Sequence, residues 1–205
     1  MNGFEKQELE TQGMMSRLFG SKPGHNALVE INNFLAESTA ATELTEEIVS
    51  NFIKNWGAKF DSSNIEYRSS MYRKVADHVY ISAVSKDDPV FEETKHLAQV
   101  LELPEKLQRL ADNGAKKVAY FSRCRKIISG EEPLTISEIN NVFGYDYEDG
   151  YDIRVQVFHD YLNKKFDEIA EQQRFSPDEE TALREICTKL DIPYEFKPNI
   201  QNALD

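Results

Sequence analysis

The same short junction recurs four times along the chain, and this repeat most constrains what the sequence can fold into. Each junction combines polar or acidic residues, an apolar residue and glutamates, and three of the four also place Ser or Thr where a helix cap belongs. The junctions lie at residues 43–47, 88–93, 133–138 and 174–180. Equivalent glutamates of successive junctions are about 46, 45 and 42 residues apart, a spacing typical of repeated two-helix units.

Apolar stripes at helical spacing precede and follow each junction. The first stripe has an i, i+1, i+4, i+7, i+8 pattern, formed by Ala27, Leu28, Ile31, Phe34 and Leu35. The third unit repeats that pattern with Tyr120, Phe121, Cys124, Ile127 and Ile128. At the junctions themselves, Thr45, Thr135 and Ser176 can each accept a backbone N–H at a helix start, and the glutamates favour the positive end of the helix dipole.

The sequence therefore predicts an all-α protein of about four consecutive helical-hairpin units, stacked as a short solenoid or a compact bundle. The predicted units cover residues 25–66, 68–110, 114–153 and 154–205. Two amphipathic helices cannot cover their own apolar face, so neighbouring units must supply the core. We expect a flexible N-terminal arm at residues 1–24, units one and two at 25–110, and units three and four at 111–205.

Charge and cysteine content narrow the functional classes. The formal net charge of -12 would repel nucleic acid, so no nucleic-acid partner is expected. The two cysteines, Cys124 and Cys187, fall on apolar stripes and imply no disulfide scaffold. With no secretory signal and no run of about 18 apolar residues, a cytoplasmic location is expected.

Three cations make one flank of the predicted third-unit helix basic. At about 100° per residue, Lys116, Arg123 and Lys126 share this flank, while the apolar stripe points inward. The ordinary interpretation is a solvated face that pairs with acidic residues of neighbouring units. The functional interpretation is a docking surface for an acidic protein partner, with RNA as a less favoured alternative.

The N-terminal arm contains a second candidate contact. Met14, Met15, Leu18 and Phe19 could form one or two turns of amphipathic helix before the break at residues 20–24. We expect the arm to pack loosely or not at all, with docking to a partner or a membrane surface as the alternative.

An acidic connection follows the third junction. It carries Asp146, Glu148, Asp149 and Asp152, and Asp149 with Gly150 predicts a hairpin-like turn. The spacing fails the EF-hand pattern, because the twelfth ligand position falls on Gln156. A solvated turn is the first expectation, and divalent-cation binding by the four carboxylates is the alternative.

Catalytic signatures are absent from the sequence. It has no P-loop, no dinucleotide-binding glycine pattern, no nucleophile elbow and no zinc-type His or Cys cluster. We therefore expect no enzyme activity and no cofactor.

The fourth unit carries the clearest resemblance to known families. Residues 175–180 read Phe-Ser-Pro-Asp-Glu-Glu, and residues 190–193 read Leu-Asp-Ile-Pro. This helix pair resembles those of TerB-like tellurite-resistance domains and of the helical repeats of the chloroplast inner-envelope import scaffold. The resemblance covers about forty residues. It implies an all-helical module, metal-associated in the first family and a protein scaffold in the second.

The leading functional prediction is a non-enzymatic helical-repeat protein that acts as a protein–protein interaction or regulatory module. The repeat accounts for most of the informative residues and leaves no catalytic constellation. The alternative is a TerB-like protein that binds a divalent metal or small ligand through its acidic inter-helix loops. An unidentified protein partner is expected, and a homodimer formed through an apolar C-terminal end is a further hypothesis.

Overall fold

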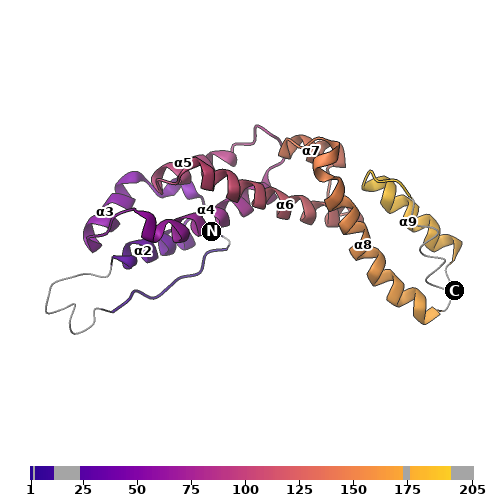
Figure 1. Cartoon of the computed structure of the whole chain (residues 1–205), viewed down its shortest axis with the longest axis horizontal. Helices are drawn as coiled ribbons and strands as arrows, with labels where there is room; N and C mark the ends of the chain where they lie inside the picture. Colours follow the sequence, from indigo (N-terminus) through magenta and orange to yellow (C-terminus); the bar gives the residue numbers. More distant parts are fainter. Residues whose placement is uncertain (2, 12–23, 173–175, 195–205) are drawn as a thin grey trace. The chain divides into compact units, whose positions relative to one another are not determined.

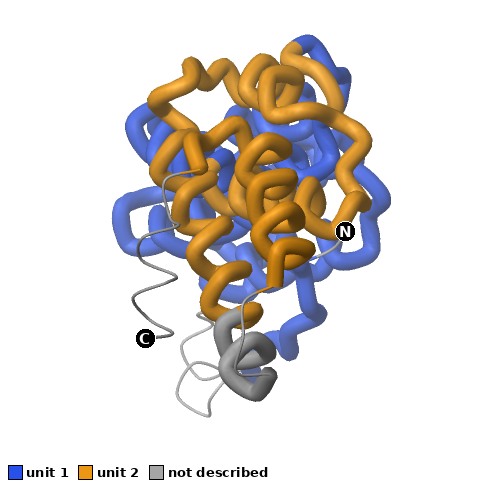
Figure 2. Tube along the Cα trace, turned by 90° about the vertical axis from the view of Figure 1, so that its right-hand side faces the viewer, with its two compact units in different colours: residues 1–83, 87–116 blue, residues 84–86, 117–205 orange. Residues whose placement is uncertain are grey.

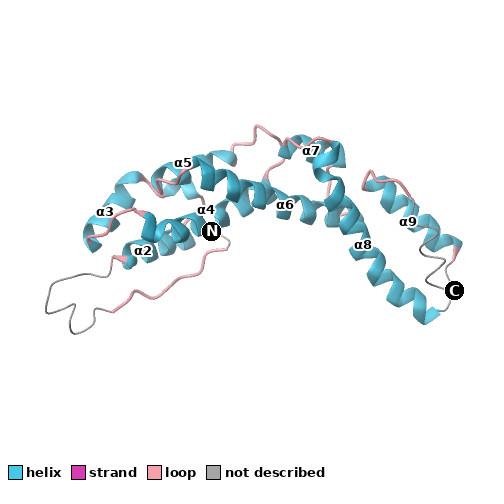
Figure 3. Ribbon diagram, in the orientation of Figure 1, coloured by secondary structure: helices cyan, strands magenta, loops and turns pink. Residues whose placement is uncertain are grey.

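The described secondary structure is entirely helical. A computed structural model describes residues 1, 3–11, 24–172 and 176–194 of the chain. Over these residues it has eight α-helices, two short 3-10 helices and no strand (Figure 1; Figure 3). The prediction of an all-α protein is confirmed.

The chain divides into two compact units, and unit 1 comprises residues 1–83 and 87–116 (Figure 2). Its elements are α2 (His25–Glu37), η1 (Ala41–Glu43), α3 (Glu46–Trp56), η2 (Ser62–Asn64), α4 (Ile65–Ser82), α5 (Phe91–Val100) and the first part of α6 (Glu105–Ser129). Helix α2 packs on α3 and also contacts α4, which packs on α5. The core is formed by side chains that include Ile31, Leu35, Leu44, Val75 and Leu97.

Unit 2 comprises residues 84–86 and the chain from 117 onward. It contains the rest of α6, then α7 (Ile136–Phe143), α8 (Tyr147–Gln172) and α9 (Pro177–Lys189). Tyr120 of α6 is fully buried, and its ring packs against Phe143 of α7 with centroids 5.9 Å apart. The division into units falls within α6, after Lys116, whereas the sequence placed a boundary after residue 110.

The helix caps predicted at three junctions are confirmed. Thr45 accepts the Ile48 N–H at the start of α3. Thr135 and Ser176 form reciprocal capping boxes with Glu138 and Glu179 at the starts of α7 and α9. The second junction, which lacks Ser or Thr, begins α5 with no side-chain cap. At these three junctions the capping residue therefore sets where the following helix begins.

The turn predicted at Asp149 and Gly150 is wrong, because α8 begins at Tyr147 and continues through both residues. A Cβ atom at Gly150 would overlap the hydroxyl and ring edge of Tyr120. Gly150 is therefore needed for close packing of α8 on Tyr120. The glycine of an Asp-Gly pair can serve either a turn or the close approach of another group to the backbone. Here it serves the close approach of the buried Tyr120 ring.

Candidate functional site

An extended segment of the chain lies along helix α2 in unit 1. This segment, residues 3–11, is called the strap, and it has no helix or strand of its own. It runs antiparallel to α2, since Gln7 bonds to Asn33 while Glu10 bonds to Asn26 (Figure 1). The sequence predicted a flexible arm for residues 1–24. Over the strap the arm is instead fixed to a helix by hydrogen bonds.

Two asparagines of α2 hold the strap by its main chain. The Gln7 N–H donates to Asn33 Oδ1 and Asn33 Nδ2 donates to the Gln7 carbonyl, both at 2.8 Å. The Glu10 N–H donates to Asn26 Oδ1 at 2.8 Å, and Asn26 Nδ2 donates to the Glu10 carbonyl at 3.0 Å. Each asparagine thus pairs with both polar main-chain groups of one residue, as a neighbouring β-strand would.

The spacing of these two pairs follows from backbone geometry. Asn26 and Asn33 are seven residues apart, so they lie on one face of α2 and are separated by about 10.5 Å along its axis. Gln7 and Glu10 are three residues apart, and an extended chain covers about 9–10 Å over three residues. The helix and the extended strap therefore stay in register across both pairs.

A third asparagine fixes the strap closer to its start. Asn32 Nδ2 donates to the Glu5 carbonyl at 2.8 Å. Asn32 and Asn26 are 1% and 0% exposed, respectively. Buried amides require hydrogen-bond partners, and for these two the strap main chain supplies them. The strap consequently completes the polar side of α2.

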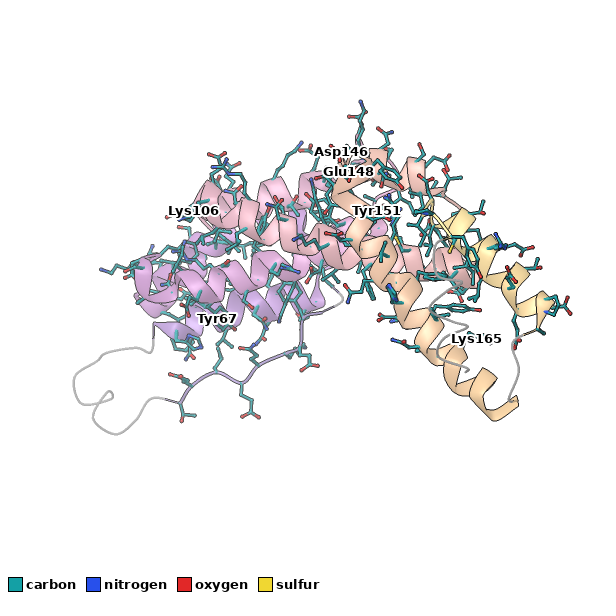
Figure 4. All side chains as sticks on the ribbon, turned by 45° about the vertical axis from the view of Figure 1, so that its right-hand side comes forward. Tyr67, Lys106, Asp146, Glu148, Tyr151 and Lys165 are labelled. Carbon is teal, nitrogen blue, oxygen red and sulfur yellow. The ribbon has the colours of Figure 1, made fainter. Side chains whose placement is uncertain are left out.

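Two strap side chains also contact helix α4 of the same unit. Phe4 is 8% exposed, and the Lys74 ammonium of α4 lies 4.9 Å from the centre of its ring. The Tyr67 hydroxyl of α4 donates to Gln7 Oε1 at 2.6 Å, and Tyr67 lies on the side of the unit that faces the strap (Figure 4). Burial raises the pKa of Tyr67 above its ordinary value, so the hydroxyl remains a donor at neutral pH. The strap-binding surface formed by α2 and α4 is called the groove.

Contacts at the end of α2 complete the attachment. The Met1 amino group donates to the carbonyls of Leu35, Ala36 and Ser38 at 3.0, 3.1 and 2.7 Å. These carbonyls lie at the helix C-terminus, where a positive charge is favourable. Lys6 forms an exposed ion pair with Glu37, which lowers the pKa of that carboxyl.

The predicted basic flank is not a continuous exposed surface. Arg123 is 5% exposed, and its guanidinium lies 5.6 Å from the centre of the Phe143 ring. The expectation of an exposed residue is therefore wrong for Arg123, which lies three residues after the buried Tyr120 and so belongs to the buried stripe. Lys126 is exposed, while Lys116 of unit 1 is half-buried with its ammonium 5.7 Å from the Tyr80 ring centre.

The predicted acidic residues form a helix start. Asp146, Glu148, Asp149 and Asp152 are all exposed at the beginning of α8, where Figure 4 labels Asp146 and Glu148. The Asp146 N–H donates to Asp149 Oδ2 at 3.1 Å, and the Asp149 N–H donates to Asp146 Oδ1 at 3.0 Å. Over the described part of the chain, no group of three or more His, Cys, Asp or Glu side chains could hold a metal ion.

The other predicted contact residues, Met14, Met15, Leu18 and Phe19, lie outside the described residues. The asparagines of α2 that hold the strap, Asn26, Asn32 and Asn33, were missed by sequence reasoning. A signal was present, because Asn26 and Asn33 repeat at a seven-residue interval beside the apolar stripe of α2. Buried Arg154 of unit 2 was also missed, and no motif marks it.

Comparison with protein families, with curated proteins and with solved structures gave no match to this chain. In the described residues, none of the helices combines the length and the apolar character that crossing a bilayer requires. The functional argument therefore depends on the geometry of the chain itself.

Proposed function

We propose that this chain is a non-enzymatic interaction module whose groove binds an extended segment of a partner protein. The observation that carries the proposal is the pairing of Asn26 and Asn33 with the main chain of the strap. Main-chain pairing does not depend on the side chains of the bound segment. It is the means by which proteins commonly recognise extended peptides.

Occupation of the groove by the chain's own strap supplies regulation. The strap and α2 belong to one polypeptide, so a partner segment competes with a ligand at a local concentration of about millimolar. Partner binding then requires release of the strap. In this proposal the strap sets the threshold concentration at which a partner is bound.

We further propose that the four helix pairs α2/α3, α4/α5, α6/α7 and α8/α9 form a short solenoid or compact bundle. The long helix followed by a short one recurs in this order along the chain, and α2/α3 and α4/α5 pack as pairs. Such an array presents the same helix face repeatedly, and extended partners commonly bind along such faces.

Peptide binding to the full chain tests the interaction proposal. The probe is an acetylated, fluorescent peptide with the sequence of residues 3–11. The protein carries Phe4→Ala and Gln7→Ala, which remove the two side-chain anchors of its own strap; this protein is called the open-groove variant. We expect saturable binding by fluorescence anisotropy.

Adding Asn33→Ala to the open-groove variant should weaken probe binding about tenfold, because two hydrogen bonds are lost. Asn33 is only half-buried, so this change should leave the unit folded. The matched control is Asn51→Ala, an exposed asparagine on α3. Equal affinity for the Asn33→Ala and Asn51→Ala proteins would refute main-chain recognition by α2.

A further inference from the structure

We propose that the groove selects partner segments that carry Phe and Gln separated by two residues, and that the strap is an internal copy of this ligand. The inference rests on the proposed function and adds sequence selectivity to it. Within the strap, Phe4 and Gln7 are the residues whose side chains enter contacts with α4.

Phe4 acts as the apolar anchor of the bound segment. Its side chain is almost fully buried although the strap lies at the surface, and the Lys74 ammonium covers its ring. A large aromatic side chain removes more apolar surface from water than any other strap residue can. Buried aromatic anchors of this kind usually dominate the affinity of an interface.

Gln7 acts as the polar anchor. Its main chain pairs with Asn33 while its side-chain oxygen accepts the Tyr67 hydroxyl, so two helices contact one residue of the strap. A residue without a side-chain acceptor at this position would leave the half-buried Tyr67 hydroxyl without this bond. The groove therefore distinguishes Gln from an aliphatic residue here.

The separation of the two anchors is fixed by the asparagines. Asn32 holds the carbonyl of Glu5, and Asn33 holds both main-chain groups of Gln7. These bonds set the path of the chain between Phe4 and Gln7. In a segment whose Phe and Gln are separated by a different number of residues, only one of the two side chains could reach its contact on α4.

Gly3 has a φ of 86°, which favours glycine, whereas the strap positions after Phe4, apart from Gln7, place little demand on the side chain. The exposed strap residues are Gly3, Glu5, Lys6, Gln7, Glu8, Leu9, Glu10 and Thr11, and among them the Gln7 side chain bonds to Tyr67 of α4. The Lys6 ion pair with Glu37 has both side chains largely in water, so it adds little to affinity. Leu9 is 41% exposed despite being apolar. The selected pattern is thus Phe-x-x-Gln in an extended, otherwise variable segment.

The occupant we propose is a segment of a partner protein with this pattern, which displaces the strap. The strap demonstrates the fit, because the same side chains already occupy the same contacts. Removing the anchors from the chain itself should weaken the hold of the strap on the groove without altering α2 or α4, while the main-chain bonds to Asn26, Asn32 and Asn33 can still form. Wild-type protein should therefore bind the probe more weakly than the open-groove variant, by about tenfold or more.

The test compares four acetylated peptides against the open-groove variant and the wild-type full chain. They are the sequence of residues 3–11 and its Phe4→Ala, Gln7→Ala and Leu9→Ala forms. Isothermal titration should give a loss of about thirtyfold for Phe4→Ala and about fivefold for Gln7→Ala, with Leu9→Ala unchanged as the matched control.

The outcomes separate the two proposals. Equal affinity of all four peptides, with binding still reduced by Asn33→Ala, would overturn the Phe-x-x-Gln selectivity and leave main-chain recognition standing. Absence of binding by every peptide to the open-groove variant, at peptide concentrations above the roughly millimolar local concentration of the strap, would overturn both. Equal binding of the unsubstituted peptide by the wild-type and open-groove proteins would overturn the role of the strap as an internal ligand.

Discussion

Asn26 of unit 1 and Arg154 of unit 2 are both fully buried polar side chains, but their hydrogen-bond partners come from different sources. In unit 1, Asn26 is completed by the main chain of the strap. In unit 2, Arg154 donates to the Tyr120 hydroxyl at 2.9 Å and to the Tyr147 carbonyl at 3.1 Å, both within the unit's own helices. In the function we propose, a partner of the first kind can be replaced by another chain, whereas a partner of the second kind is part of the unit's own helices.

This difference distinguishes the proposed binding surface of unit 1 from the structural core of unit 2. The Arg154 guanidinium also lies 4.5 Å from the Tyr147 ring centre, and the Tyr120 hydroxyl in turn donates to Asn140 Oδ1 at 2.7 Å. Residues of α6, α7 and α8 are thereby joined around one cation. The strap, in contrast, contributes only one largely buried side chain, Phe4, to unit 1. Loss of the strap should therefore cost unit 1 much less than loss of Arg154 costs unit 2.

Substitution of Arg154 should give the largest effect. Arg154→Ala removes two hydrogen bonds and leaves a cavity, so we expect a loss of about 3 kcal/mol in the free energy of unfolding. Urea unfolding followed by circular dichroism measures it. Arg125→Ala, at an exposed position of α6, is the control and should change the free energy by less than about 0.5 kcal/mol. An equal effect of both substitutions would remove the structural role assigned to Arg154.

High pH should destabilise unit 2 through Cys124. Burial raises the pKa of this thiol from 9.0 to about 12. Between these values the unfolded chain loses a proton that the folded chain keeps, so stability is full below pH 9 and falls as the pH rises toward 12. The contribution approaches about 1.4 kcal/mol per pH unit.

Urea unfolding of the wild-type protein and of Cys124→Ala from pH 8 to 11 measures this slope. The wild-type slope should be the steeper one. Burial also raises the pKa of Tyr120 to about 12, and the charge of Cys124 adds to that rise, so the difference between the slopes reports the thiol together with its effect on Tyr120. Parallel slopes would contradict the burial of Cys124 in the folded core.

Substitution of Tyr67 should give the smallest effect. Tyr67→Phe removes the hydroxyl that donates to Gln7 Oε1 and leaves the ring, so the strap should open about threefold more often. Amide hydrogen exchange at Gln7 and Glu10 reports this opening. The stability of the helices should be unchanged, since no helix pairing depends on this hydroxyl. Unchanged exchange at both amides would show that Tyr67 contributes nothing to holding the strap.

Helix positions were predictable from local chemistry, and the site was not. Thr45, Thr135 and Ser176 cap helices within three residues of themselves, so a short sequence window contains the whole interaction. The bonds of Asn33 to Gln7 span 26 residues and join a helix to a segment without periodicity. The sequence around Asn33 does not indicate that it bonds to Gln7, and the sequence around Gln7 does not indicate that it bonds to Asn33.

The errors at Arg123 and Gly150 share one cause. Charge indicated an exposed Arg123, and the Asp-Gly pair indicated a turn, but both residues lie against aromatic side chains of unit 2. Aromatic rings can cover a cation or require a glycine, and the local sequence does not reveal which ring will be near. Tertiary packing therefore overrode two local rules in the same part of the fold.

Competition between the strap and an added peptide tests the central claim most directly. Amide exchange at Gln7 and Glu10 of the wild-type chain would be followed while unlabelled acetylated peptide of residues 3–11 is added in excess. If the peptide takes the place of the strap, exchange at both amides should accelerate by about tenfold, while the helix amides of α2 stay protected. Saturating peptide that leaves the exchange of Gln7 and Glu10 unchanged would contradict the groove as a site for an exchangeable extended segment.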